Sequence, residues 1–107
     1  MMLVTLAQAF RQLRIEMDDD ETPANHPEKD DVEFRAKLAT GNVMDYIKDR
    51  DNQNEWTDAT CPAPVQASIL IVLSDLDEHR AGSAADDVFI SEAVRRLLAR
   101  WRDPALA

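Results

Sequence analysis

Apolar residues recur at helical spacing in four stretches of the chain, and polar residues separate those stretches. The first stretch predicts a short helix over residues 5–15 that ends at an acidic run, residues 18–21. Thr5 and Gln8 predict a capping box at its start, because each side chain can accept a hydrogen bond from a backbone N–H group that lacks a helical partner. The apolar face of this helix is expected to consist of Leu6, Phe10, Leu13 and Met17.

A second helix is predicted over residues 31–50, with Asp30 or Asp31 as its cap. The polar segment before it contains Pro23 and Pro27 and is expected to be a loop. Gly41 lies mid-helix at a cost of about 1 kcal/mol relative to alanine, which favours a kink or a close helix crossing. The predicted apolar stripe consists of Val32, Ala36, Ala39, Val43, Tyr46 and Ile47, and Phe34 and Leu38 are expected to widen it.

The third helix is predicted over residues 63–81, with Pro64 in its first turn, where a missing N–H group costs nothing. The apolar run of residues 69–73 also suits a strand, but the helical pattern continues through the charged residues after it, and Gly82 can end a helix. Apolar residues on more than one side place this helix at the centre of the fold. They are Val65, Ile69, Val72 and Leu76 on one face, and Leu70 and Leu73 on the next.

The last helix is predicted over residues 91–102, capped by Ser91 and ended by Asp103 and Pro104. Its apolar positions are Val94, Leu97, Leu98 and Trp101. Only two glycines and five prolines occur in 107 residues, which favours helix over turn-rich β structure. We therefore expect one all-α domain over residues 1–107: a small bundle of about four helices with a central apolar third helix and long connecting loops.

The formal net charge is −9, from 21 acidic and 12 basic residues. Binding nucleic acid through its phosphates requires clustered lysine and arginine side chains, so this charge argues against general nucleic-acid binding. An acidic surface would let DNA pass without adhering, and it would equally keep a small protein soluble. Residues 1–4 lack the features of a signal peptide, and residues 69–73 are too few to span a membrane. We expect no membrane partner and a cytosolic location, unless an assembly carries the protein out.

Candidate catalytic and metal-binding residues are few. Cys61 is the only cysteine, so a disulfide within the chain is impossible and a zinc site built from thiolates is disfavoured. His26 with nearby carboxylates matches no known metal-ligand motif, and His79 is expected to interact with the C-terminus of its own helix. No serine has an adjacent histidine or a glycine elbow to activate it. The sequence therefore predicts no enzyme activity and no cofactor.

Four motifs occur in the order found in one viral family. The first motif is Val-Thr-Leu at residues 4–6, followed by Leu-Arg-Ile at 13–15 and three aspartates at 18–20, and the second is Asp30-Asp31 at the start of the long helix. The third motif is Cys-Pro-Ala-Pro-Val at 61–65, followed by Glu-His-Arg at 78–80. The fourth is Ala-Val-Arg-Arg-Leu-Leu at 93–98, followed by Trp-Arg-Asp-Pro at 101–104. Over nearly its whole length the chain resembles the gp6-like head-tail connector (adaptor) family of tailed bacteriophages. It departs from the family at Ile90-Ser91, where proline is usual, at Asp77, where tyrosine is usual, and at Gly41.

The resemblance implies a structural head-tail connector, or head-completion protein, that forms a ring beneath the phage portal protein. Such rings are commonly dodecameric, extend the DNA tunnel and present a surface to a stopper or tail-completion protein. DNA would pass through the ring without specific binding. The protein would then be found in the host cytoplasm during assembly and at the head-tail junction of the virion.

Three sets of residues are expected to serve this role. Helices two and three would supply much of the subunit interface, residues 101–107 would reach the portal, and the acidic run would face the DNA tunnel. The subunit-interface set is Tyr46, Ile47, Leu70, Leu73, Asp77 and Arg80, the portal set is Trp101, Arg102 and Leu106, and the tunnel set is Asp18, Asp19, Asp20 and Glu21. An ordinary solvated loop explains the charge of the tunnel set equally well.

A rival from another class is a small acidic helical adaptor or inhibitor that binds another protein, for example by mimicking DNA. A DNA mimic needs carboxylates along one face at phosphate-like spacing. Here the acidic residues cluster in a loop and at helix ends, and the last helix is crowded with arginines, which favours head-to-tail docking instead. These arginines are Arg95, Arg96, Arg100 and Arg102.

Overall fold

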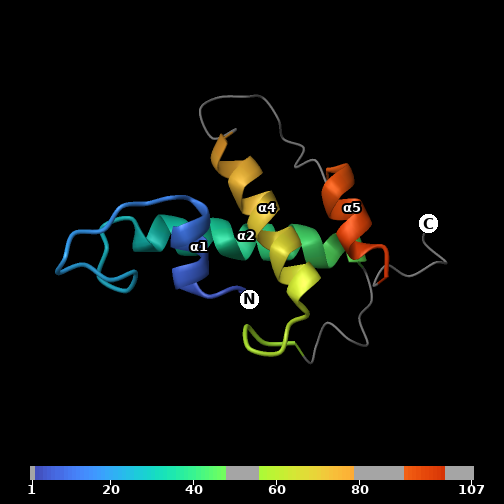
Figure 1. Ribbon diagram of the computed structural model, residues 1–107, viewed down its shortest axis with the longest axis horizontal. Coiled ribbons are helices and arrows are strands. Elements are labelled where there is room, and N and C mark those ends of the chain that lie inside the picture. The colour runs from blue at the N-terminus through green and yellow to red at the C-terminus, as the bar shows by residue number, and fades with distance from the viewer. Residues whose placement is uncertain (1, 48–55, 79–90, 101–107) are drawn as a thin grey trace.

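The computed structural model describes residues 2–47, 56–78 and 91–100. These residues form four helices and no strand: α1 (Leu6–Gln12), α2 (Lys29–Ile47), α4 (Ala63–Glu78) and α5 (Glu92–Leu98). The all-α prediction is therefore confirmed. α1 and α4 lie across the long helix α2, and α5 packs beside α4 (Figure 1). α4 contacts each of the other three helices, as expected of a central helix.

The predicted caps of α1 and α5 are observed, whereas α2 does not begin at its predicted cap, and α5 ends at Leu98 although residues 99 and 100 were predicted to be helical. Ser91 caps α5, its hydroxyl accepting a hydrogen bond from the backbone N–H of Val94 at 3.4 Å. α2 begins slightly earlier than predicted, so Asp30 and Asp31 lie in its first turn, where carboxylates favour the positive end of the helix dipole. The predicted extensions over residues 48–50, 79–81 and 101–102 lie outside the described residues. Among the residues described, no helix is long and apolar enough to cross a bilayer.

α1 begins as predicted and ends early. Gln8 donates its backbone N–H to the Thr5 hydroxyl at 3.1 Å, and the Gln8 side chain accepts from the Thr5 N–H at 2.7 Å, which completes the capping box. The helix stops after Gln12 because Arg14 adopts a left-handed conformation, with φ of 56°. Two hydrogen bonds reverse the chain: Arg14 N–H to the Arg11 carbonyl at 3.1 Å and Ile15 N–H to the Phe10 carbonyl at 3.2 Å.

This early end corrects the predicted apolar face of α1. Phe10 is buried and Leu13 is half-buried, but Met17 lies beyond the helix and its side chain is 41% exposed. Four residues of spacing place Met17 below Leu13 only if the helix continues, and the turn at Arg14 prevents this. A glycine usually occupies such a left-handed position, so the sequence carried no signal for the turn.

The core lies between α2, α4 and the segments that cross them. α2 contributes one continuous buried face, and α4 is buried on more than one side, as predicted. The buried residues of α2 are Val32, Ala36, Ala39, Thr40, Val43, Met44 and Ile47, and those of α4 are Val65, Ser68, Ile69, Val72 and Leu73. From α5, Val94 and Leu98 complete the core against α4.

Two expectations for α2 are wrong. Phe34 and Leu38 do not widen the buried stripe, since their side chains are 67% and 44% exposed. At about 100° per residue they lie on the side of the helix opposite Ala36 and Val43. Gly41 also marks neither a kink nor a crossing within the chain, because α2 runs unbroken past it and a Cβ added there would meet no atom within 4 Å.

The segment before α1 is part of the core, which the helical pattern did not indicate. Leu3 and Val4 are fully buried. The backbone of Leu3 is bound on both sides: its N–H donates to the Thr40 hydroxyl of α2 at 3.4 Å, and its carbonyl accepts from the Gln66 side chain of α4 at 3.0 Å. Because a buried backbone group without a partner is costly, these two side chains make burial of an extended segment possible.

Candidate functional site

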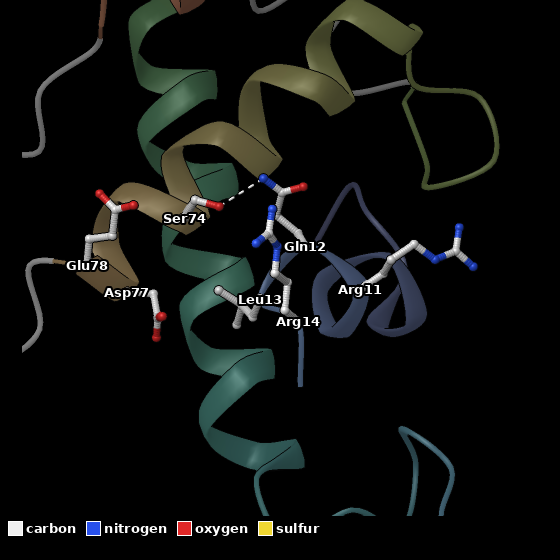
Figure 2. Close-up of a pocket in the computed structure, with 7 residues that line it drawn as sticks. All are labelled: Arg11, Gln12, Leu13, Arg14, Ser74, Asp77 and Glu78. Atoms are coloured by element: carbon white, nitrogen blue, oxygen red, sulfur yellow. Dashed lines mark hydrogen bonds between the residues drawn. The ribbon is translucent and has the colours of Figure 1, made fainter. Parts of the chain in front are cut away.

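A pocket of about 420 Å³ opens between the end of α1 and the C-terminal half of α4 (Figure 2). Its lining consists of Arg11, Gln12, Leu13, Arg14, Ser74, Asp77 and Glu78. The Gln12 side chain donates a hydrogen bond to the Ser74 hydroxyl at 2.8 Å and so joins the two helices across the pocket. Two guanidinium groups and two carboxylates balance each other in charge, so the lining favours neither an anion nor a cation.

A smaller pocket of about 190 Å³ adjoins the first and shares Leu13 and Asp77 with it. Between α2 and α4, Arg35 donates to the Asp77 carboxylate at 2.9 Å and lies 3.0 Å from the Asp31 carboxylate one turn earlier in α2. The Arg35 side chain is only 16% exposed. An ion pair that is shielded from water and joins two helices contributes more than an exposed pair along one helix.

Both pockets lie where polar side chains connect neighbouring helices. The polar side chains that could act on a ligand are instead bound to partners on a neighbouring helix, as Gln12 is to Ser74 and Arg35 is to Asp77. In the described ranges, no group of three or more histidine, cysteine, aspartate or glutamate side chains is placed to hold a metal ion. The two side-chain contacts position α1 and α2 on α4.

Cys61 lies just before α4 in the buried core. Burial raises the pKa of the thiol from about 9 to about 11, because the thiolate would lose its hydration. At neutral pH the thiol is therefore protonated, and a protonated, buried thiol is a poor nucleophile and a poor metal ligand. Cys61 thus acts as a small apolar residue at the junction between the loop and α4.

The acidic run lies in an ordered loop between α1 and α2. The Asp18 N–H donates to the Glu21 carboxylate at 2.9 Å, and the Glu21 N–H donates back to the Asp18 carbonyl at 2.9 Å. Further along, the His26 ring packs edge-on against Phe10 with centroids 5.2 Å apart, which ties the loop to α1. Asp19 and Asp20 are exposed with Asp18, whereas Glu21 is half-buried. The loop thus presents three aspartates to solvent and uses Glu21 to hold its shape.

The residues expected at a subunit interface fall into three groups. Ile47 and Leu73 are fully buried within the single chain, so their side chains are already packed in its own core. Tyr46 and Leu70 are half-buried beside that core, and Asp77 is paired with Arg35. Arg80 lies outside the described residues, as does the whole portal set of Trp101, Arg102 and Leu106.

The surface that the sequence interpretation missed is the outer face of α2, which we define by Phe34, Leu38 and Gly41 with Asp30 and Asp45 at its two ends. All five residues are exposed. Residues spaced by four, seven and eleven positions share one side of a helix, so the spacing from residue 34 to 38, 41 and 45 contained this signal. It was obscured because Phe34 and Leu38 were counted with the buried stripe.

A second exposed surface is the arginine face of α5, formed by Arg95 and Arg96 with Ala99, the C-cap residue just after the helix. Arg96 pairs with Glu92 at 2.9 Å along its own helix. α5 and the acidic loop lie at opposite ends of α2 (Figure 1), so the basic and the acidic surfaces are well separated. No protein-family model, no curated protein and no solved structure matches this chain.

Proposed function

We propose that this chain is a structural head-tail connector of a tailed phage, which forms a ring beneath the portal protein, extends the DNA tunnel and joins head to tail. The observation that carries the proposal is the separation of charge: three exposed aspartates at one end of the molecule and the arginines of α5 at the other (Figure 1). The separation of charge gives each copy two unlike ends, and contacts between unlike surfaces of identical copies close into a ring when the rotation allows it.

The exposed apolar residues of α2 support the same proposal. A soluble chain of this size gains little from leaving Phe34 and Leu38 in water, and exposed apolar groups on one helix face are typical of protein contact surfaces. The order of four helices, beginning with the capped α1, is the order that the resemblance implies.

The rival function, a DNA mimic, is less well supported by the arrangement of the acidic groups. Asp31 and Asp77 share Arg35, and Glu33 lies 3.1 Å from Lys37. Much of the negative charge along α2 and α4 is thus neutralised by cations on the same or a neighbouring helix. The described carboxylates form no continuous row that could replace a DNA backbone.

The proposal is tested by native mass spectrometry of the purified chain over a range of concentrations. Closed oligomers near a dozen copies are expected. If the chain is monomeric, the test moves to co-assembly with the portal protein encoded near it, which some connectors need as a template. Failure to assemble alone and failure to bind the portal would together overturn the proposal.

Two parts of the proposal have separate tests. Deletion of residues 103–107 is expected to weaken portal binding, and unchanged binding would refute the portal contact of the C-terminal segment. Reversal of charge at Asp18, Asp19 and Asp20 is expected to alter DNA retention or ejection in assembled particles. If particles carrying the reversed charges retain and eject DNA normally, the acidic loop does not line the tunnel.

A further inference from the structure

Gly41 has no structural purpose within the single chain. A glycine in a helix interior lowers helix stability relative to alanine, because the backbone loses more freedom on folding. Such a residue is often required where another helix approaches closely, yet a Cβ at Gly41 would meet nothing within 4 Å. The backbone at Gly41 is also open to solvent. The space above this glycine is therefore available to another molecule.

Gly41 shares its side of α2 with the two most exposed large apolar residues of that helix, Phe34 and Leu38. One turn separates Phe34 from Leu38, and Gly41 follows one turn later. Apolar side chains beside a position without a side chain form a ridge and a groove, which is the shape that a second helix packs against. The outer face of α2 is thus shaped as a helix-docking surface.

The charges at the ends of this face decide between two possible occupants from a second copy. If α2 packed on α2 of another copy, Asp30 and Asp45 would lie opposite acidic residues in either orientation, and like charges would repel. Lys37 at the edge of the face is already engaged with Glu33 at 3.1 Å. The outer face of α2 therefore requires an occupant that carries cations.

The arginine face of α5 has the matching properties. Ala99, at the C-cap of α5, is small and exposed, so an aromatic ring such as Phe34 can approach the backbone there closely. Arg95 is exposed on this helix and can reach a carboxylate at one end of the docking surface, whereas Arg96 is paired with Glu92 at 2.9 Å and would have to exchange that partner for one on the neighbouring copy. Arginine also stacks favourably on a phenylalanine ring.

We propose that the outer face of α2 binds the arginine face of α5 from a second copy of this chain. The contact joins two different surfaces, so each copy can bind one neighbour through α2 and another through α5, and the chain of contacts closes into a ring. This inference rests on the proposed function for its biological setting, and it names the subunit contact that the ring would use.

The first test combines stability with association. Gly41→Ala is expected to raise the melting temperature of the monomer by about 4–8 °C, because alanine favours the helix. The same substitution is expected to weaken self-association at least tenfold in sedimentation velocity, because the new methyl group fills the approach site. Met17→Ser, an exposed apolar residue away from this face, serves as the control and should leave association unchanged. A variant at Gly41 that associates as tightly as the natural chain would overturn the proposal.

The second test uses complementation between two damaged chains. Phe34→Asp removes the α2 surface, and Arg95→Glu with Arg96→Glu removes the α5 surface, so each variant alone is expected to be monomeric. Their mixture retains one intact pair of surfaces and is expected to form a dimer of one copy each in native mass spectrometry. Arg11→Glu, an exposed arginine on α1, is the control for charge reversal and should assemble as the natural chain does.

The outcomes separate this inference from the proposed function. Three outcomes would each refute the α2–α5 contact and leave the connector function standing. They are rings that form equally well from all variants, a mixture that stays monomeric, and a natural chain that assembles only on the portal. Self-association through these two surfaces into small or open oligomers, with no closed ring and no binding to a portal protein, would confirm the contact and refute the connector function.

Discussion

The two sides of α2 differ in a way that the residue types alone do not reveal. The inner side is built mainly of small and β-branched residues, such as Ala36, Ala39 and Val43, and it is fully buried. The outer side carries Phe34, which is larger than any of them, and leaves it 67% exposed. Small residues let α1 and α4 cross closely over the inner side, whereas a phenylalanine there would hold them apart. Hydrophobicity is therefore a poor guide to which side of this helix faces the core.

The largest expected effect comes from deleting equivalent side chains on the two sides. Ile47→Ala should lower the free energy of unfolding by about 2–5 kcal/mol, since it removes fully buried methyl groups and leaves a cavity. Leu38→Ala should lower it by less than about 1 kcal/mol, because the leucine is already 44% exposed in the folded chain. Urea unfolding at a concentration where the chain is monomeric measures both. If the two substitutions lowered the free energy of unfolding equally, the buried and exposed sides of α2 would be wrongly assigned.

Burial also makes the stability of the fold depend on pH, through the thiol of Cys61. The folded thiol, with a pKa near 11, keeps its proton between pH 9 and 11, while the unfolded thiol, with a pKa near 9, releases it. The unfolded state therefore gains free energy as the pH rises, and folding stability should fall by up to about 2 kcal/mol across that range. Cys61→Ala lacks this contribution, so the difference between the two pH profiles isolates it. If the stabilities of Cys61→Ala and the natural chain changed in parallel with pH, the thiol would not be shielded from water in the folded chain.

A smaller effect is expected at Arg35, which lies on the border between the two sides of α2. Arg35→Met keeps the aliphatic stem but removes the ion pairs with Asp31 and Asp77, and should cost about 1 kcal/mol in thermal or urea unfolding. High salt should reduce the difference in unfolding free energy between Arg35→Met and the natural chain, because it screens the ion pairs. Lys37→Met, on the opposite border and half exposed, is the matched control and should cost much less. If both substitutions lower the free energy of unfolding equally, the ion pair between α2 and α4 stabilises the fold no more than the exposed Lys37–Glu33 pair does.

The smallest effect belongs to Glu33 on that second border. A hydrogen bond from Lys37, followed by the charges of Lys37 and Lys29, lowers the pKa of the Glu33 carboxyl below its ordinary value of 4.5. The unfolded chain therefore takes up this proton first as the pH falls, so the stabilising contribution is complete above pH 4.5 and is lost below it. Glu33→Gln should show a shallower loss of stability in acid. An identical acid profile for both chains would contradict the ion pair.

Local sequence explains most of the helical content of this protein. The caps at Thr5 and Ser91 each use hydrogen bonds between residues three apart, and the buried positions of α4 follow the helical period. The candidate site was less predictable. Asp77 was selected as an interface residue, but its partner Arg35 is 42 positions away, and nothing in the local pattern joins them.

Arg14 shows how the tertiary structure overrides local preference. A left-handed arginine costs about 1 kcal/mol or more relative to glycine, so the local sequence alone favours continuing the helix. The turn persists because it places Ile15 against the core beside Phe10 and brings Gln12 to Ser74, which lies 62 positions away. The packing of these residues outweighs the strain of one backbone angle.

By itself, the sequence determined that the protein is helical, where α1, α4 and α5 begin, and that its acidic run forms a loop, since these depend on hydrogen bonds and spacings within a few residues. The tertiary structure decided which side of α2 is buried, that α1 ends at Gln12, and that Leu3 and Val4 belong to the core. The bonds that support the buried Leu3 reach Thr40 and Gln66, 37 and 63 positions away. Such contacts depend on the global arrangement of the chain, because their free energy is gained only after distant segments have been brought together.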